Sequence, residues 1–174
     1  MEKYIAFLRG INVGGHKKIL MADLKLIFES LGFEKVTTYI QSGNVVFATE
    51  NVANLVAKIT NAIEVKYGFK ESILVKKASE LEEILSKSPF LVEKLKKSYF
   101  ILLEEKPSQE YIALTTTFSN SNEEFYITEN CVYIYYAQGA GKSKFSNNFF
   151  EKKLNVTATA RNYNTIAKLV ELSR

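Results

Sequence analysis

VTTYIQSGNVVFA, residues 36–48, has the pattern of a β-hairpin. Two runs rich in β-branched and aromatic residues, 36–40 and 44–48, flank the short polar segment Gln41-Ser42-Gly43. Runs of this composition favour strands, and a short segment with glycine between them favours a tight turn. We therefore predict two antiparallel strands joined directly, and the elements on either side are interpreted around this hairpin.

A helix and a further strand are expected on each side of the hairpin. Before it, residues 4–9 (YIAFLR) form an apolar run, and residues 21–32 place hydrophobic side chains at helical spacing. After it, a second helical pattern begins beyond Asn51, a typical N-cap residue, and ends at Gly68. The run SILVK, residues 72–76, completes the order βαββαβ, which is typical of ferredoxin-like domains.

The second half of the chain repeats this order approximately. Strands are expected at 99–104, 124–128, 131–137 and 157–160, and helices from Ser108, over 144–154 and from Asn162. The sequence therefore predicts an α+β protein of two ferredoxin-like subdomains with antiparallel sheets, packed around a cleft. The predicted segments are 1–78 for the first subdomain, 79–97 for connecting helices and 98–174 for the second subdomain.

Composition narrows the class of protein. No segment of the 174 residues approaches the roughly 20 apolar residues that a transmembrane helix needs, and the apolar run near the start is too short for a signal peptide. We therefore expect a cytoplasmic protein that does not bind membranes. A single cysteine, Cys131, and a single histidine, His16, provide neither a disulfide nor a structural zinc site. No metal and no cofactor are expected.

The net charge of +4 is concentrated in two loop segments. Residues 9–18 (RGINVGGHKK) contain Arg9, Lys17 and Lys18 without an acidic residue. Residues 137–161 contain five basic residues against Glu151 alone. Charge gathered in loops favours a local anion site over a general polycation.

GAGKS, residues 139–143, has the sequence of the end of a phosphate-binding P-loop. A complete P-loop would need glycine at position 136, where this chain has Tyr136, and a parallel sheet. A Walker-type nucleotide hydrolase is therefore not expected. A glycine turn that leads into a helix, with Ser143 as N-cap, can still bind an anion through free N–H groups. The alternative is a plain turn between a strand and a helix.

Three other polar segments have the same two interpretations. The loop at residues 9–18 is either functional or simply solvated, and Asn12 is either a turn residue or a reader of a polar ligand. The polar residues of 41–44 form a hairpin turn or recognise a base or sugar. In RNYNT, residues 161–165, Asn162 caps a helix while Arg161 could bind a phosphate or carboxylate.

The residues predict no catalytic centre. The paired glutamates, such as Glu82-Glu83, are adjacent in sequence and point apart on a helix or strand. The serines lack a histidine partner other than His16, and no G-x-S-x-G segment is present. The sequence therefore assigns no reaction, and it leaves open whether the protein is an enzyme.

Several blocks, in order, resemble the bacterial family catalogued as domain of unknown function 1697. These blocks are IAFLRGINVGGHKKILMADLKLIFESLGF, TYIQSGNVVF, GAGKSKF and KKLNVTATARNYNT, and the resemblance covers about residues 1–170. Tyr163 stands where the family more often has tryptophan. The resemblance implies a compact α+β fold of two subdomains and brings no catalytic residues. It also favours a shared ligand site, because its signature segments are loops.

Three functions remain open at this stage. The first is a cleft, lined by two basic glycine loops, that binds an anionic, phosphate-bearing small molecule such as a nucleotide. The second is an RNA- or DNA-binding module with stacking aromatics at Tyr39, Phe47, Tyr133 and Tyr135. The third is a protein-interaction scaffold, and the oligomeric state is not predicted. The expected ligand-binding residues are Arg9, Asn12, Gly14, Gly15, Lys17, Gln41, Ser42, Asn44, Gly139, Gly141, Lys142, Ser143, Lys144, Arg161 and Asn162.

Overall fold

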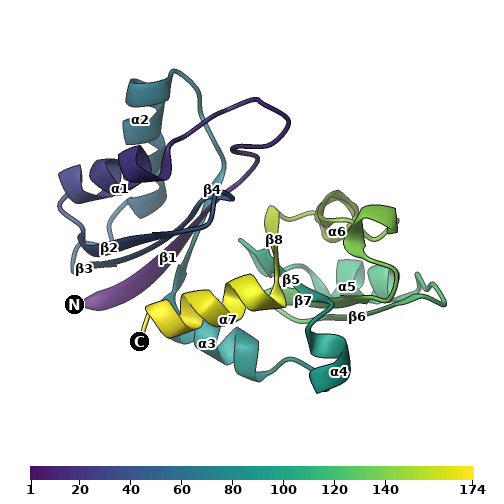
Figure 1. Ribbon diagram of the computed structural model, residues 1–174. Helices are drawn as coiled ribbons and strands as arrows, with labels where there is room; N and C mark the ends of the chain where they lie inside the picture. Colours follow the sequence, from purple (N-terminus) through teal and green to yellow (C-terminus); the bar gives the residue numbers. More distant parts are fainter. The chain divides into compact units, whose positions relative to one another are not determined.

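A computed structural model describes residues 1–174 and contains two compact units (Figure 1). Unit 1 comprises Met1–Glu82 and Lys168–Arg174, and unit 2 comprises Glu83–Ala167. The units differ from the predicted segments at two places, since residues 83–97 group with unit 2 and residues 168–174 with unit 1. Each unit holds one four-stranded antiparallel sheet, which confirms the predicted fold class.

The sheet of unit 1 has the strand order β2-β3-β1-β4. Its strands are β1 (Glu2–Leu8), β2 (Glu34–Tyr39), β3 (Asn44–Thr49) and β4 (Ile73–Lys77). The helices α1 (Met21–Ser30) and α2 (Leu55–Tyr67) cover one face of this sheet (Figure 1). This arrangement is the predicted βαββαβ order, with the first strand in an inner position.

The core of unit 1 lies between this sheet and its two helices. Phe47 on β3 is fully buried and contacts the rings of Phe28 on α1 and Phe33, with centroid distances of 5.3 and 4.7 Å. On α2, Ile59 and Ile63 are also fully buried. Alternate residues of the strands and one stripe of each helix thus supply the core, as an amphipathic sequence pattern requires.

Unit 2 has the same sheet topology, with strand order β6-β7-β5-β8. Its strands are β5 (Ser98–Leu103), β6 (Glu123–Ile127), β7 (Cys131–Tyr136) and β8 (Ala158–Asn162), and its sheet is packed by α5 (Gln109–Thr116) and α6 (Asn147–Leu154). Short elements are α4 (Val92–Leu95) and the 3₁₀ turn η1 (Ala140–Lys142). The helices α3 (Ala78–Ser86) and α7 (Tyr163–Leu172) span the boundaries between the units.

Two helices begin three or more residues later than expected. The α2 helix starts at Leu55 rather than just beyond Asn51, whose side-chain oxygen accepts instead from the N–H of Ala53 at 3.2 Å. The α6 helix starts at Asn147, with Ser146 rather than Ser143 as its N-cap. The prediction that Asn162 caps the last helix is confirmed, because its side-chain oxygen accepts from the N–H of Thr165 at 2.9 Å.

Candidate functional site

The first glycine loop, residues 9–18, folds into a tight hairpin rather than an open cradle. The N–H of His16 donates to the carbonyl of Val13 at 3.2 Å, and Gly14 and Gly15 between them have φ of +60° and +79°. Positive φ at both central positions is the mark of a type I′ turn, which few residues other than glycine and asparagine adopt. The two glycines therefore serve the turn itself.

The Asn12 amide fixes this hairpin to the neighbouring turn of β2 and β3. Its Nδ2 donates to the carbonyls of Ile19 at 3.0 Å and Gln41 at 2.9 Å, and its Oδ1 accepts from the N–H of Ile19 at 2.9 Å. Both amide N–H groups are thus used within unit 1. Asn12 was expected to be either a turn residue or a reader of a ligand, and its contacts are those of a structural clamp.

One of the cations in the first glycine loop, Lys17, is paired within the protein. Lys17 Nζ lies 2.6 Å from Glu71 Oε1, and the Glu71 side chain is only 7% exposed. The positive charge of Lys17 is therefore balanced by a carboxylate. Arg9 is half-buried, and its backbone N–H donates to the carbonyl of Ser72 at 3.0 Å.

The QSGN turn, residues 41–44, is stabilised by its own polar groups. Asn44 is fully buried, and its Nδ2 donates to the carbonyl of Tyr39 and to Ser42 Oγ, both at 3.0 Å. The carbonyl of Gln41 accepts from Asn12, so the structure does bring these two predicted segments together. The contacts favour the hairpin-turn interpretation of Ser42 and Asn44 over ligand recognition.

The GAGKS turn, residues 139–143, follows the end of β7 in unit 2. Tyr136, at the place of a P-loop's first glycine, ends a strand of an antiparallel sheet. Ser143 does not cap a helix, because its Oγ accepts from the N–H of Phe145 at 2.8 Å within a turn. The expected delivery of N–H groups to an α-helix start is therefore wrong. The N–H groups of Ala140 and Gly141 nevertheless donate to no group within the chain.

A pocket of about 450 Å³ lies beside the GAGKS turn, and we call it the lysine pocket. It contains two lysines and no carboxylate, and the rings of Tyr99 and Tyr136 pack edge to face there with centroids 5.4 Å apart. Burial raises the pKa of the Tyr136 phenol, which stays neutral and donates to the carbonyl of Phe145 at 2.7 Å. The lining residues are Lys96, Lys97, Tyr99, Tyr136, Ala137, Gln138, Gly139, Ala140 and Asn162.

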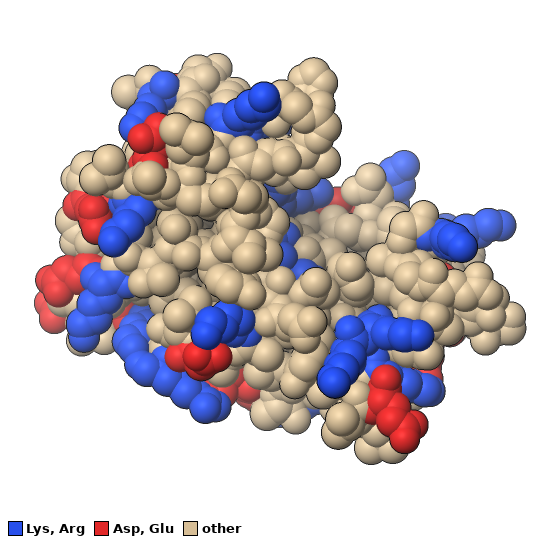
Figure 2. Space-filling view, viewed as in Figure 1, with Lys and Arg blue, Asp and Glu red and all other residues tan.

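The two lysines of the lysine pocket are not paired with acidic side chains. Figure 2 shows basic and acidic side chains interspersed over the visible face, and many of them pair, as Lys168 does with Glu171 at 2.7 Å. Neither Lys96 nor Lys97 forms an ion pair. The lysine pocket therefore presents uncompensated positive charge.

The sequence analysis did not identify Lys96 and Lys97 as site residues, although their place directly before a strand could have indicated it. They end the run KLKK, directly before β5, and β5 pairs with β7 in the register Ser98 to Tyr135. In an antiparallel pair, the start of one strand lies beside the end of the other. The N–H of Tyr136 accordingly donates to the carbonyl of Lys97 at 3.3 Å, which places both lysines next to the residues that follow β7.

The remaining predicted residues of unit 2 divide between two faces of its sheet. Asn162 lines the lysine pocket. Arg161 is the preceding strand residue, so its side chain leaves the opposite face, where Nη1 donates to Thr159 Oγ1 at 2.9 Å. Arg161 is therefore not part of the lysine pocket. Lys142 and Lys144 are exposed on or just after the GAGKS turn and do not line the pocket.

The aromatic residues considered for base stacking are only partly available. Phe47 is fully buried in the core of unit 1, and Tyr133 is 2% exposed with its hydroxyl donating to the carbonyl of Ile84 at 2.9 Å. Tyr39 and Tyr135 are half-buried. Two of the four rings thus present no face to a nucleic-acid base.

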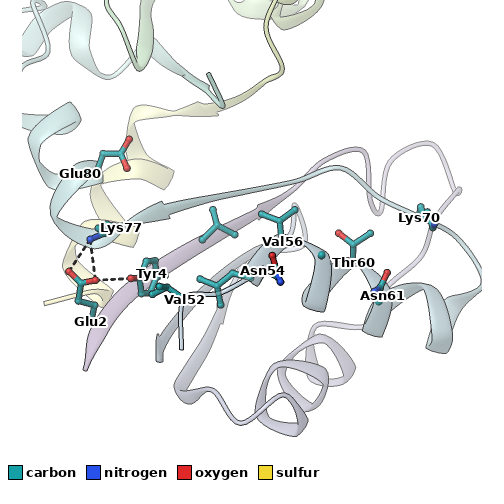
Figure 3. Close-up of a pocket in the computed structure, with 13 residues that line it drawn as sticks. Glu2, Tyr4, Val52, Asn54, Val56, Thr60, Asn61, Lys70, Lys77 and Glu80 are labelled. Atoms are coloured by element: carbon teal, nitrogen blue, oxygen red, sulfur yellow. Dashed lines mark hydrogen bonds and ion pairs between the residues drawn. The ribbon is translucent and has the colours of Figure 1, made fainter. Parts of the chain in front are cut away.

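A larger pocket, of about 820 Å³, lies between α2 and β4 in unit 1, and we call it the α2–β4 groove (Figure 3). At one end Glu2 accepts from the Tyr4 hydroxyl at 2.7 Å and from Lys77 Nζ at 3.2 Å. Burial and, to a lesser extent, the hydrogen bond to Glu2 raise the pKa of Tyr4 to about 12. Sequence reasoning did not identify this groove, because its residues carry no motif.

Replacing Tyr4 by phenylalanine is expected to reduce the loss of stability at alkaline pH. The folded state holds the Tyr4 phenol neutral up to a pKa of about 12, against 10.0 for an unperturbed tyrosine. Its stabilising contribution is therefore complete below pH 10 and is lost as the pH rises through 12. Urea unfolding across this range should show a shallower decline for Tyr4→Phe than for the wild type. Tyr111→Phe, at an exposed phenol, is the control, and equal slopes for wild type and Tyr4→Phe would contradict the assignment.

No group of three or more histidine, cysteine, aspartate or glutamate side chains is arranged to hold a metal ion. Cys131 is buried and forms no disulfide. None of the helices is both long and apolar enough to cross a membrane.

The family is decided by a sequence comparison. The sequence model of the family described as "Protein of unknown function (DUF1697)" matches residues 1–133. The chain belongs to this family. The match includes the first glycine loop, the QSGN turn and both lysines of the lysine pocket, while the GAGKS turn and Asn162 lie beyond residue 133. The resemblance inferred from the sequence blocks is thus confirmed.

Solved structures with the same fold include that of the conserved bacterial protein SP0830 from Streptococcus pneumoniae. Its sequence is 26% identical to this DUF1697 chain, the alignment covers 99% of each chain, and the TM-score is 0.75. The similarity therefore extends past residue 133 and includes the GAGKS turn and β8. No curated protein matches the sequence at a significant level.

Proposed function

We propose that the lysine pocket of unit 2 binds the phosphate group of a small molecule. The observation that carries this proposal is a pocket lined by two lysines without ion pairs and by no carboxylate. An anion entering it would compensate charge that the protein itself leaves unbalanced. Lysine is a common phosphate ligand that acts as a point charge.

Backbone and aromatic groups support the same ligand. The N–H groups of Ala140 and Gly141 lie on the turn that walls the pocket and have no partner within the chain. Such N–H groups can donate to phosphate oxygens. Lys142, in the same turn, adds positive charge close by. The ring of Tyr99 gives the pocket an apolar wall for the uncharged part of the ligand.

The proposal narrows the set of residues expected from the sequence. Gly139 and Asn162 remain in it as lining residues, Gly141 and Lys142 remain as neighbours in the GAGKS turn, and the lining residues Lys96 and Lys97 join them. Asn12, Ser42, Asn44 and Ser143 leave it, because their side chains are engaged in turns. Lys17 leaves it because Glu71 neutralises its charge, and Arg161 because it lies on the other face of the sheet.

The proposal predicts that a Lys96→Gln/Lys97→Gln double variant loses phosphate affinity. Each charge-assisted hydrogen bond contributes about 1.5 kcal/mol or more, so the dissociation constant for AMP or pyrophosphate should rise about tenfold or more. Isothermal titration of the full chain at low and moderate salt measures this change. A Lys18→Gln/Lys58→Gln variant removes the same net charge from two lysines of unit 1 that do not line the lysine pocket, and it should keep wild-type affinity.

Three other results would contradict the proposal. Equal weakening in the two double variants would show that the ligand responds only to the overall charge of the protein. Unchanged affinity in Lys96→Gln/Lys97→Gln would place the phosphate elsewhere. Binding of an RNA oligonucleotide but not AMP, with a steep dependence on salt, would favour nucleic-acid recognition instead.

A further inference from the structure

The α2–β4 groove has an apolar middle that is open to solvent (Figure 3). Val52 and Val56 line it and are 55% and 38% exposed, and Val75 of β4 also lines it. Thr60 and Asn61, farther along α2, also line the groove, and their side chains make no hydrogen bond within the chain. Its volume of about 820 Å³ is within the range of pockets that bind ligands.

The backbone of β4 has unpaired groups along the side of this groove. β4 is an edge strand whose one neighbour is β1. The N–H of Arg9 donates to the carbonyl of Ser72, so these opposed residues form a hydrogen-bonded pair. Because hydrogen-bonded and non-bonded pairs alternate in an antiparallel ladder, the pair Ala6 and Val75 is non-bonded. The N–H and C=O groups of Val75 therefore point away from β1, at the open edge.

The charged residues of the groove are all compensated within unit 1. Lys77 lies 3.2 Å from Glu2, Glu80 lies 2.7 Å from Lys76, and Lys70 lies 3.4 Å from Glu64. The groove therefore offers no net charge to a ligand, in contrast to the lysine pocket. An uncharged ligand segment therefore suits the groove best. A charged segment would lose its hydration there without gaining an ion-pair partner.

We propose that the α2–β4 groove binds an extended, uncharged peptide segment that adds a fifth strand to the sheet of unit 1 at β4. The free N–H and C=O groups of Val75 pair with the peptide backbone, as in other cases of strand addition. Alternate side chains of the peptide point toward α2, where they cover Val52 and Val56. A peptide is favoured over a compact ligand because the unpaired backbone groups of β4 lie along the side of the apolar groove. This inference is independent of the phosphate site.

The probe is the capped peptide acetyl-Thr-Val-Ser-Leu-Thr-Val-Ser-amide, added to the full-length protein. Binding is measured by titration calorimetry, and the amide signals of Val75 and Lys77 are followed by NMR. We expect binding to shift these two signals, and N-methylation of the peptide's central backbone N–H groups to weaken binding about tenfold or more, because strand pairing needs them. Equal binding of the N-methylated peptide would overturn the proposal, since a pocket for side chains alone would not distinguish the two.

Two substitutions on one helix provide a matched pair. Val56→Asp places a charge in the groove and should abolish binding of the capped peptide, whereas Val65→Asp, at a residue that is 88% exposed and outside the groove, should not change it. Equal affinity in both variants would overturn the proposal. Sedimentation velocity tests the other occupant, a second copy of the chain. Self-association that is lost in Val56→Asp, without peptide binding by the wild type, would assign the groove to a dimer and overturn the peptide proposal.

Discussion

Replacing Gly43 by alanine is expected to destabilise unit 1 by about 2 to 5 kcal/mol. Two effects add at this position of the QSGN turn. Its φ of +78° costs an L-residue about 1 to 2 kcal/mol. An added Cβ would also lie 2.6 Å from Ile11 Cδ1 and 2.9 Å from Leu8 Cβ, and overpacking of this kind costs about 1 to 3 kcal/mol. Urea and thermal unfolding should show the loss, with a fall in Tm of roughly 10 °C or more.

Gly68→Ala separates the two effects at Gly43. Gly68 ends α2 with a φ of +75°, but a Cβ placed there would meet no atom within 4 Å. This variant should therefore lose only the conformational part, about 1 kcal/mol. Equal losses of stability in Gly43→Ala and Gly68→Ala would contradict the overpacking argument. They would show that Ile11 and Leu8 move aside for the added Cβ at little cost.

Replacing Asn12 by alanine is expected to cost about 2 to 4 kcal/mol. The change removes three hydrogen bonds, two to Ile19 and one to the carbonyl of Gln41, each contributing about 1 kcal/mol. It also places alanine at a φ of +56°, which asparagine tolerates better. Equilibrium unfolding measures the loss, and faster amide exchange in residues 13–18 should accompany it as the first glycine loop loses its clamp.

Asn54→Ala is the matched control for Asn12→Ala. Asn54 has a nearly identical φ of +57° in the same unit, and its side chain makes no capping hydrogen bond. It should lose about 1 kcal/mol through backbone strain alone. A loss of stability in Asn12→Ala no greater than that in Asn54→Ala would show that the three hydrogen bonds of Asn12 add nothing beyond those that water provides.

The order of the strands along the chain in both units could be predicted from local sequence. Each strand run has a composition that favours extended chain, and the segments between runs carry glycine or asparagine where the chain turns. The Gln41-Ser42-Gly43 segment shows why this works, since Gly43 adopts a backbone conformation that other residues avoid. Fold class thus depends on features that are visible within a few residues.

Helix starts were harder to predict for a physical reason. Asn51 and Ser143 were expected to cap helices, but their side-chain oxygens accept from the N–H groups of Ala53 and Phe145, two residues later. An N-cap makes the same kind of bond one residue farther on, as Ser146 does with Phe149. Asparagine and serine favour both arrangements, so their presence locates a helix start only to within a few residues.

The candidate site depended on contacts between distant residues. Lys96 and Lys97 acquire their place beside the GAGKS turn through the pairing of β5 with β7, which no local pattern records. Arg161 is excluded by strand alternation, because a shift of one residue moves a side chain to the other face. The α2–β4 groove was not predictable because apolar residues such as Val52 and Val56 have the spacing of core residues.

The inner position of β1 has a consequence for how unit 1 folds. β1 pairs with β3 on one side and with β4 on the other, and both strands come later in the chain. No hairpin between neighbouring elements can complete this sheet, so closing it requires a long chain loop and carries its entropic cost. High contact order of this kind slows folding. Until β4 docks, an intermediate would expose the edge of β1, whose residues Tyr4–Leu8 are buried in the complete sheet, and this makes the intermediate prone to aggregate.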